Sequence, residues 1–172
     1  MVFWLLLTMP TVLFSQWFPL DMPTLFNMGE HLQERLPWIL SPHNGSGRYF
    51  PLYWLYHAAQ YLLFGSSVWP YFVVLSVIYL AGTVFIARTI WRMTGSLRIA
   101  ALLFVSLYIN TPTPENLTTI GKGEPLAFFL IACVVAVFRS GVERGSLSKR
   151  SMIFITLCFL AAIWIKETSL VL

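Results

Sequence analysis

The sequence predicts an all-α, polytopic helical membrane protein with about five membrane helices and a long first outer loop that carries two interfacial amphipathic helices. Two observations support this prediction. Of the 172 residues, 58% are hydrophobic and only 10% are charged, whereas soluble domains carry roughly 25% charged residues. Long apolar runs alternate with short polar stretches, and the mean hydropathy is +0.73. These values exclude an ordinary soluble domain, a disordered chain and a small disulfide-linked scaffold.

Five apolar runs are candidates for membrane helices, because a helix needs about 20 apolar residues to cross the hydrocarbon core. They are Val2–Leu20, Val68–Met93, Leu97–Asn110, Pro125–Phe138 and Met152–Ile165. The first run lacks a basic segment and a cleavage site, which favours a retained helix over a removed signal peptide. The third and fourth hold about 14 residues each, roughly 21 Å of helix, so they either span a thinned region or form a hairpin that enters from one side.

The fifth run continues into further apolar residues at the end of the chain. This ending indicates truncation, so residues 1–172 are predicted to be the N-terminal portion of a longer transmembrane domain.

The long outer loop, residues 21–67, is predicted to hold two helices on the membrane surface. Between Met22 and Leu36, apolar residues recur at helical spacing opposite a charged face, which is typical of an amphipathic helix. Turn-forming residues follow over Ser41–Gly47. Pro51 then opens a second helix, Leu52–Phe64, that is rich in Tyr and Trp. Such aromatic side chains favour the headgroup level, so the two helices are expected to cover a cleft at the membrane surface.

The distribution of charge predicts which side each loop faces. Two stretches, Arg88–Arg98 and Arg139–Arg150, together hold seven Lys or Arg residues and a single acidic residue, Glu143. Positively charged loops are retained in the cytoplasm, so both stretches are predicted to be cytoplasmic. The other segments hold four basic and six acidic residues and are predicted to face outward. We expect a multi-pass integral membrane protein, with a bacterial plasma membrane favoured because no other targeting signal is present.

The net charge of +4 does not indicate a nucleic-acid partner. Nucleic-acid binding requires basic residues gathered into one patch with exposed aromatic residues among them, and this chain has no such patch. Most of the positive charge is therefore interpreted as a signal for the orientation of the chain in the membrane.

Several segments carry a family resemblance. Asp21 directly follows the first apolar run, and the stretch Gly47-Arg-Tyr-Phe-Pro-Leu-Tyr-Trp-Leu55 leads into an aromatic helix. This order resembles the N-terminal part of the GT-C superfamily of polytopic membrane glycosyltransferases, which includes protein mannosyltransferases and aminoarabinose transferases. The stretches Asn116–Ala127 and Lys166–Ser169 are similar to later parts of uncharacterised members. The resemblance implies that a sugar moves from a polyprenyl-phosphate donor to an acceptor at the outer membrane face, with this lipid-linked donor and membrane lipids as partners.

The resemblance also implies a general base for the acceptor hydroxyl, and Asp21 takes that place. A carboxylate at the membrane edge is partly desolvated, which raises its pKa toward the range that a base requires. Asp21 is explained equally well as the N-cap of the helix that follows it.

Six further residues are predicted to bind the substrate: Arg48, Tyr49, Lys122, Glu124, Lys166 and Glu167. Arg48 can bind a phosphate through two parallel hydrogen bonds, and the lysines supply point charges. Lys166 and Glu167 form an ionisable pair at the end of an apolar run, where charge is costly. The alternative is that these charged side chains only reach toward water or pair with each other, and that Glu124 only begins a helix.

No motif requires a cofactor, although residues of the outer loop could hold a divalent metal ion. Glu30 and Glu34 share a polar helix face with His31, but a solvated face is the favoured interpretation. His57 lacks the spacing of a metal ligand and is predicted to pack at the interface. The two cysteines lie in apolar runs and are predicted to be packing residues without a disulfide.

The sequence is also compatible with two functions other than sugar transfer. A transporter or flippase-like protein would use the same cleft for lipid passage without breaking a bond, but the chain shows no inverted internal repeat. An inactive membrane fragment is the other alternative.

Overall fold

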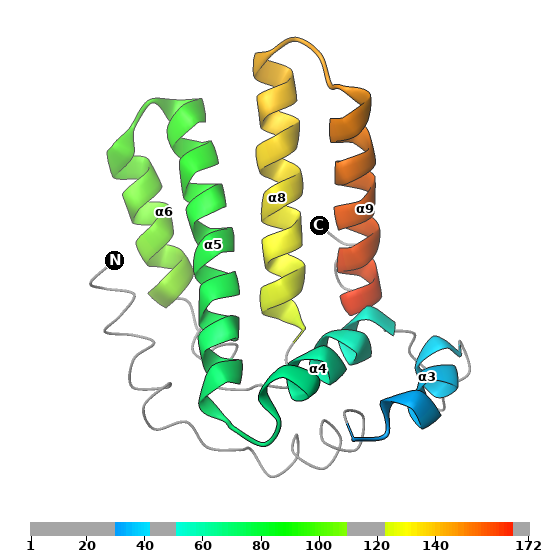
Figure 1. Ribbon diagram of the computed structural model, residues 1–172. Coiled ribbons are helices and arrows are strands. Elements are labelled where there is room, and N and C mark those ends of the chain that lie inside the picture. The colour runs from blue at the N-terminus through cyan, green and yellow to red at the C-terminus, as the bar shows by residue number, and fades with distance from the viewer. Residues whose placement is uncertain (1–29, 42–50, 110–122, 167–172) are drawn as a thin grey trace.

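The computed structural model describes residues 30–41, 51–109 and 123–166, in which α-helices joined by short connections are the secondary structure (Figure 1). The helices are α3 (Leu32–Leu40), α4 (Pro51–Phe64), α5 (Trp69–Thr94), α6 (Leu97–Ile109), α8 (Glu124–Glu143) and α9 (Lys149–Ile165). The expected all-α class is therefore confirmed for these residues. The predicted first membrane helix, Val2–Leu20, lies outside the described residues.

Four of these helices form an upright bundle, and two lie at one end of it. In Figure 1, α6, α5, α8 and α9 stand next to one another in that order. α5 packs against α6 on one side and α8 on the other, and α8 also packs against α9. α4 lies across the lower ends of α8 and α9, with α3 beside it. The helix predicted over Leu52–Phe64 is thus confirmed as α4, Pro51–Phe64.

Two helices, α5 with 26 residues and α8 with 20, are long and apolar enough to cross a membrane. Only 28% of the apolar segment of α8 is buried, whereas the core helix of a soluble protein buries most of such a segment. Large apolar side chains are also exposed along α9, among them Ile153, Leu157, Leu160 and Trp164. Exposed apolar surface of this extent is typical of a membrane or binding face.

Helix bounds differ from the predicted runs in three places. α8 continues past Phe138 to Glu143, so this run has 20 residues where the apolar stretch alone suggested about 14. α9 begins at Lys149 because the Ser148 side chain caps it, accepting a hydrogen bond from the Ser151 backbone N–H at 3.1 Å. The described part of the first surface helix runs through Pro37 to Leu40, beyond the expected end at Leu36. α6, with 13 residues, is as short as predicted.

The bundle interior is built from small residues and stacked rings. A Cβ atom on Gly82 of α5 would lie 2.9 Å from the Phe128 ring and 3.2 Å from the Phe129 backbone, so the two helices approach closely there. The Tyr79 and Phe128 rings stack beside this point with centroids 5.2 Å apart. Ala132 of α8 is fully buried. Close approach at small residues is the usual way in which helices associate inside a membrane.

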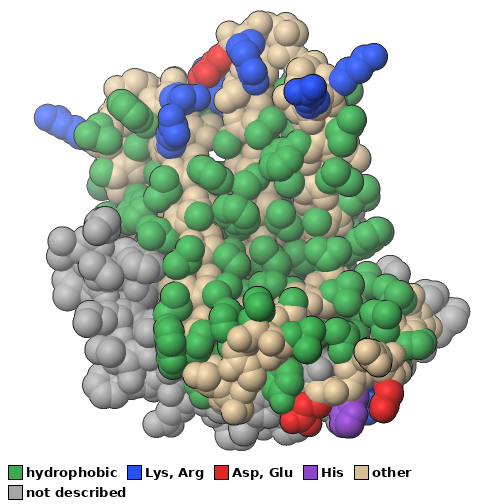
Figure 2. Space-filling view, viewed as in Figure 1, with side chains coloured by type: hydrophobic (Ala, Val, Ile, Leu, Met, Phe, Trp, Pro, Cys, Tyr) green, Lys and Arg blue, Asp and Glu red, His purple; other side chains and the backbone are tan. Residues whose placement is uncertain are grey.

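Charged side chains gather at the two ends of the bundle. In Figure 2, Lys and Arg side chains cluster at the upper end, a band of hydrophobic side chains covers the middle, and acidic and histidine side chains lie at the lower end. The α5–α6 and α8–α9 connections both lie at the upper end (Figure 1). The two arginine-rich stretches that were predicted to share one side therefore lie at the same end of the bundle.

Candidate functional site

The candidate site lies at the other end of the bundle, where α8 begins and α9 ends. Lys166 directly follows α9, and its Nζ donates a hydrogen bond to Oε1 of Glu124, the first residue of α8, at 2.5 Å. The side chains of Lys166 and Glu124 are 30% and 33% exposed, so the ion pair is shielded from water but remains accessible. Two of the predicted substrate-binding residues, 42 positions apart in the sequence, are thus brought together.

Gly123 brings the helix ends together. A Cβ atom at this position would lie 2.8 Å from Cγ2 of Ile165 in α9 and 3.2 Å from Cδ2 of Tyr53 in α4. Any larger residue would push α8 away from both neighbours. The absence of a side chain at Gly123 therefore lets α4, α8 and α9 meet beside the Lys166–Glu124 pair.

α4 covers this junction with aromatic side chains. The Tyr53 ring contacts the Trp54 and His57 rings edge to face, with centroids 4.8 Å and 4.6 Å apart. Trp38 of α3 contacts Trp54 in the same manner at 5.7 Å, and Tyr56 lies 5.0 Å from His57. These five rings form one aromatic cluster. It is a wall against which the apolar part of a ligand can pack.

His57 is the unexpected member of this cluster. Its side chain is only 1% exposed, and within the described part of the chain neither ring nitrogen has a hydrogen-bond partner. Desolvation lowers the pKa of His57 to about 4, and the nearby Gln60 side chain opposes the shift only in part. The imidazole is therefore neutral at physiological pH. The sequence predicted a packing role, which the burial supports. It did not indicate that Tyr53, one helical turn earlier, links His57 to the Lys166–Glu124 junction.

The acidic side chains at the start of α3 form pairwise contacts. Tyr61 of α4 donates a hydrogen bond to Oε1 of Glu30 at 2.8 Å, which raises the pKa of the Tyr61 hydroxyl. His31 Nδ1 lies 3.5 Å from Oε2 of Glu34. In residues 30–41, 51–109 and 123–166, no three His, Cys, Asp or Glu side chains come together as a metal site. Cys133 and Cys158 are free thiols, as expected.

Five predicted site residues lie outside the described residues: Asp21, Arg48, Tyr49, Lys122 and Glu167. The described pair offers an ammonium group and a carboxylate next to an apolar wall. Chemically, such an ammonium group can exchange its carboxylate partner for a phosphate oxygen. The released carboxylate can then accept a hydrogen bond or a proton.

Neither a known protein family, nor a curated protein, nor a solved structure matches this chain.

Proposed function

We propose that this chain belongs to a multi-pass glycosyltransferase of a bacterial plasma membrane, which moves a sugar from a polyprenyl-phosphate donor to an acceptor at the outer membrane face. The proposal is supported above all by one observation, the contact between Lys166 and Glu124 beside the aromatic cluster. This contact lies at the end of the bundle opposite the arginine-rich connections, and that end faces outward if positively charged loops remain in the cytoplasm.

A lipid-linked sugar has three parts, and the site offers a matching group for each. The phosphate is an anion, and Lys166 supplies a partly shielded cation for it. The sugar ring presents C–H faces and hydroxyls, which aromatic rings and a carboxylate such as Glu124 can contact. The polyprenyl chain is apolar and extends along the exposed apolar faces of the bundle.

The transfer breaks the bond between the anomeric carbon and the phosphate oxygen and forms a bond from the acceptor oxygen to that carbon. Polyprenyl phosphate leaves with the bonding electron pair, and Lys166 stabilises the negative charge that develops on it. The acceptor hydroxyl gives its proton to a carboxylate. Asp21 is the proposed base, and Glu124 is the candidate among the described residues.

Release of polyprenyl phosphate from a polyprenyl-phosphate sugar measures this reaction, because it reports bond cleavage whatever the acceptor is. The assay uses membranes that contain the full chain together with the native acceptors. Lys166→Gln is expected to reduce the release about 100-fold, since removal of one transition-state contact of this kind costs 10²–10³ in rate. Lys149→Gln is the matched control, because it removes the same charge at the opposite end of α9 and is expected to leave the rate unchanged.

A double exchange, Glu124→Lys with Lys166→Glu, separates a catalytic role from a structural one. The exchange keeps a salt bridge between α8 and α9 but moves the ammonium group to the other helix. If the pair only holds the helices together, the exchange restores the rate that Lys166→Gln loses. Restored activity would therefore contradict the proposed role of Lys166. Movement of the donor across the membrane without release of polyprenyl phosphate would instead support a flippase.

A further inference from the structure

A cavity of about 610 Å³ lies at the arginine-rich end of the bundle between α5, α8 and α9. Four arginines line it: Arg88, Arg92, Arg139 and Arg144. They come from two helices and the connection that follows α8, so the chain brings them together only when it folds. Because arginine stays protonated at any physiological pH, the cavity is a permanent site of positive charge.

One carboxylate balances only part of this charge. Glu143 Oε1 lies 3.4 Å from Nε of Arg139, and its Oε2 lies 3.8 Å from Nη1 of Arg92. No carboxylate in the described part of the chain pairs with Arg88 or Arg144. The Arg144 guanidinium is held in place by a hydrogen bond from its Nε to the Ser140 carbonyl oxygen, at 2.9 Å. Two guanidinium groups therefore remain for an external anion.

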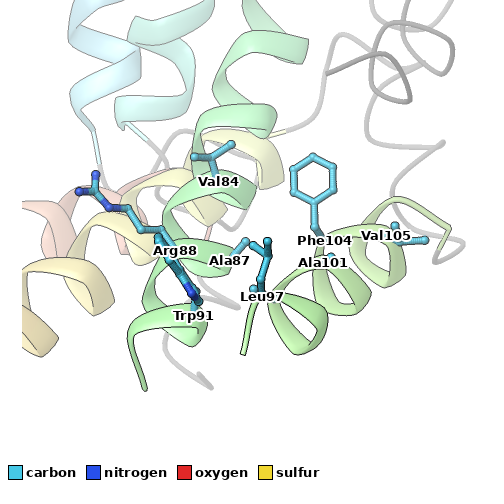
Figure 3. Close-up of a pocket in the computed structure, with 9 residues that line it drawn as sticks. Val84, Ala87, Arg88, Trp91, Leu97, Ala101, Phe104 and Val105 are labelled. Carbon is cyan, nitrogen blue, oxygen red and sulfur yellow. The ribbon is translucent and has the colours of Figure 1, made fainter. Parts of the chain in front are cut away.

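The direction of the Arg88 side chain supports this assignment. Arg88 also borders an apolar cavity of about 540 Å³ between α5 and α6. Figure 3 shows its guanidinium extending away from Leu97 and Phe104 of that cavity, toward the side on which the yellow α8 ribbon lies. The charged group of Arg88 thus belongs to the arginine-lined cavity.

Part of the lining of the same cavity is apolar. Phe85 of α5, Phe129 of α8 and Phe154 of α9 line it together with the arginines. The Phe85 and Phe129 rings stack at 5.9 Å. A soluble anion would use only the polar end of this cavity. An amphiphile with an anionic head and an acyl chain would fill both ends.

We propose that the cavity between α5, α8 and α9 binds an anionic glycerophospholipid, with its phosphate held by Arg88 and Arg144 and an acyl chain packed against Phe85, Phe129 and Phe154. This site is separate from the Lys166–Glu124 pair, and it requires the bundle to be embedded in a membrane but not to transfer sugars. It would fix the bundle at a defined depth against the inner leaflet, where anionic lipids attract basic side chains.

Native mass spectrometry of the detergent-solubilised full chain tests the proposal, with dioleoyl phosphatidylglycerol and dioleoyl phosphatidylcholine as probes. Phosphatidylglycerol is expected to bind at least about tenfold more tightly. The double variant Arg88→Gln/Arg144→Gln should lose this preference. The matched double variant Arg98→Gln/Arg150→Gln removes the same charge at the same end but outside the cavity, and should keep it. Glu143→Gln should strengthen binding, because it removes the one competing carboxylate.

Three results would overturn the proposal. Equal losses in the two double variants would show attraction by the whole basic surface and no defined site. Displacement of the lipid by millimolar inorganic phosphate would show that the cavity recognises the anion alone. Equal binding of the two lipids to the unmodified chain would show that charge is not recognised. Circular dichroism of each variant confirms that a lost preference does not reflect unfolding.

Discussion

At the scale of single residues, His57 is a polar side chain in a costly, almost fully buried environment. Burial of its imidazole, which has the Gln60 side chain nearby but no well-formed hydrogen bond among the described residues, carries a desolvation penalty of roughly 1–3 kcal/mol. Surrounding rings compensate through edge-to-face contacts with Tyr53 and a tilted contact with Tyr56. Such an arrangement persists only where the neighbouring structure or a ligand favours it. His57 lies in the aromatic cluster beside the candidate site.

His57 should make the stability of the protein depend on pH. Its pKa is about 4 in the folded chain against 6.5 for the free side chain, so the unfolded state takes up the proton first. The contribution of neutral His57 to the free energy of unfolding is therefore fully present above pH 6.5 and is lost as the pH falls toward 4. Between pH 8 and pH 5 the loss is expected to be about 2 kcal/mol.

Unfolding of the detergent-solubilised protein at the two pH values measures this difference. His57→Leu should remove most of it, whereas His31→Leu, at a side chain that is 49% exposed, should leave it intact. A His57→Leu variant with an unchanged pH dependence would contradict the assigned environment.

The residue types of the site were predictable, but their partners were not. Charge at the end of an apolar run indicated Lys166, and a Gly-rich polar stretch before a proline indicated Glu124. The sequence paired Lys166 with its neighbour Glu167, because adjacent charges are the simplest pair to expect. The Lys166–Glu124 ion pair of the structure joins residues 42 positions apart, and it depends on the packing of α8 against α9, which places the start of α8 beside the end of α9.

At the scale of elements, helix bounds follow capping chemistry more closely than hydropathy. Polar residues continue α8 beyond its apolar run to Glu143, and Ser148 begins α9 before its own run. Pro70 and Pro125 lie in the first turns of α5 and α8, where the missing backbone N–H costs nothing. Among the described residues, the apolar runs therefore located α5, α6, α8 and α9 correctly, but they underestimated the lengths of α8 and α9, whose ends carry charge.

The contact between α5 and α8 depends on Gly82, so Gly82→Leu should separate the two helices. The added side chain would meet the Phe128 ring and the Phe129 backbone. Overpacking of this kind costs about 1–3 kcal/mol or more. Thermal unfolding in detergent should show a clearly lower midpoint for Gly82→Leu, while Val77→Leu, at an exposed position of the same helix, should leave the midpoint unchanged. Similar midpoints for both variants would show that the helices do not approach closely at Gly82.

At the scale of the whole molecule, the segregation of charge gives the bundle a direction. The arginine-rich connections lie at one end, and the histidine and acidic residues of α3 lie at the other, with an apolar band between them (Figure 2). Charge counting predicted this division, because it depends only on which loop each residue occupies. The packing of α4 across α8 and α9 was not predictable in the same way, since no local pattern shows which helix ends a surface helix will contact.

Labelling of single introduced cysteines tests this direction in intact cells. Gln33→Cys in α3 is expected to react with a membrane-impermeant maleimide from outside. Thr94→Cys, at the last residue of α5, and Ser146→Cys, in the α8–α9 connection, should react only after the membrane is permeabilised. The unmodified chain, whose two thiols are buried, provides the background. Labelling of all three variants in intact cells would contradict a bundle that crosses the membrane.

The position of α4 also constrains the order in which the protein is assembled during synthesis. Tyr53 reaches its packing position beside Gly123 and Ile165 only after about 110 more residues have been translated, which takes roughly 6–22 s at 5–20 residues per second. During that interval the aromatic face of α4 has no partner from α8 or α9. Docking of α4 is therefore a late step in biogenesis. The Lys166–Glu124 pair forms only when α9 and Lys166 have been synthesised, so a chain that stops before α9 would lack it.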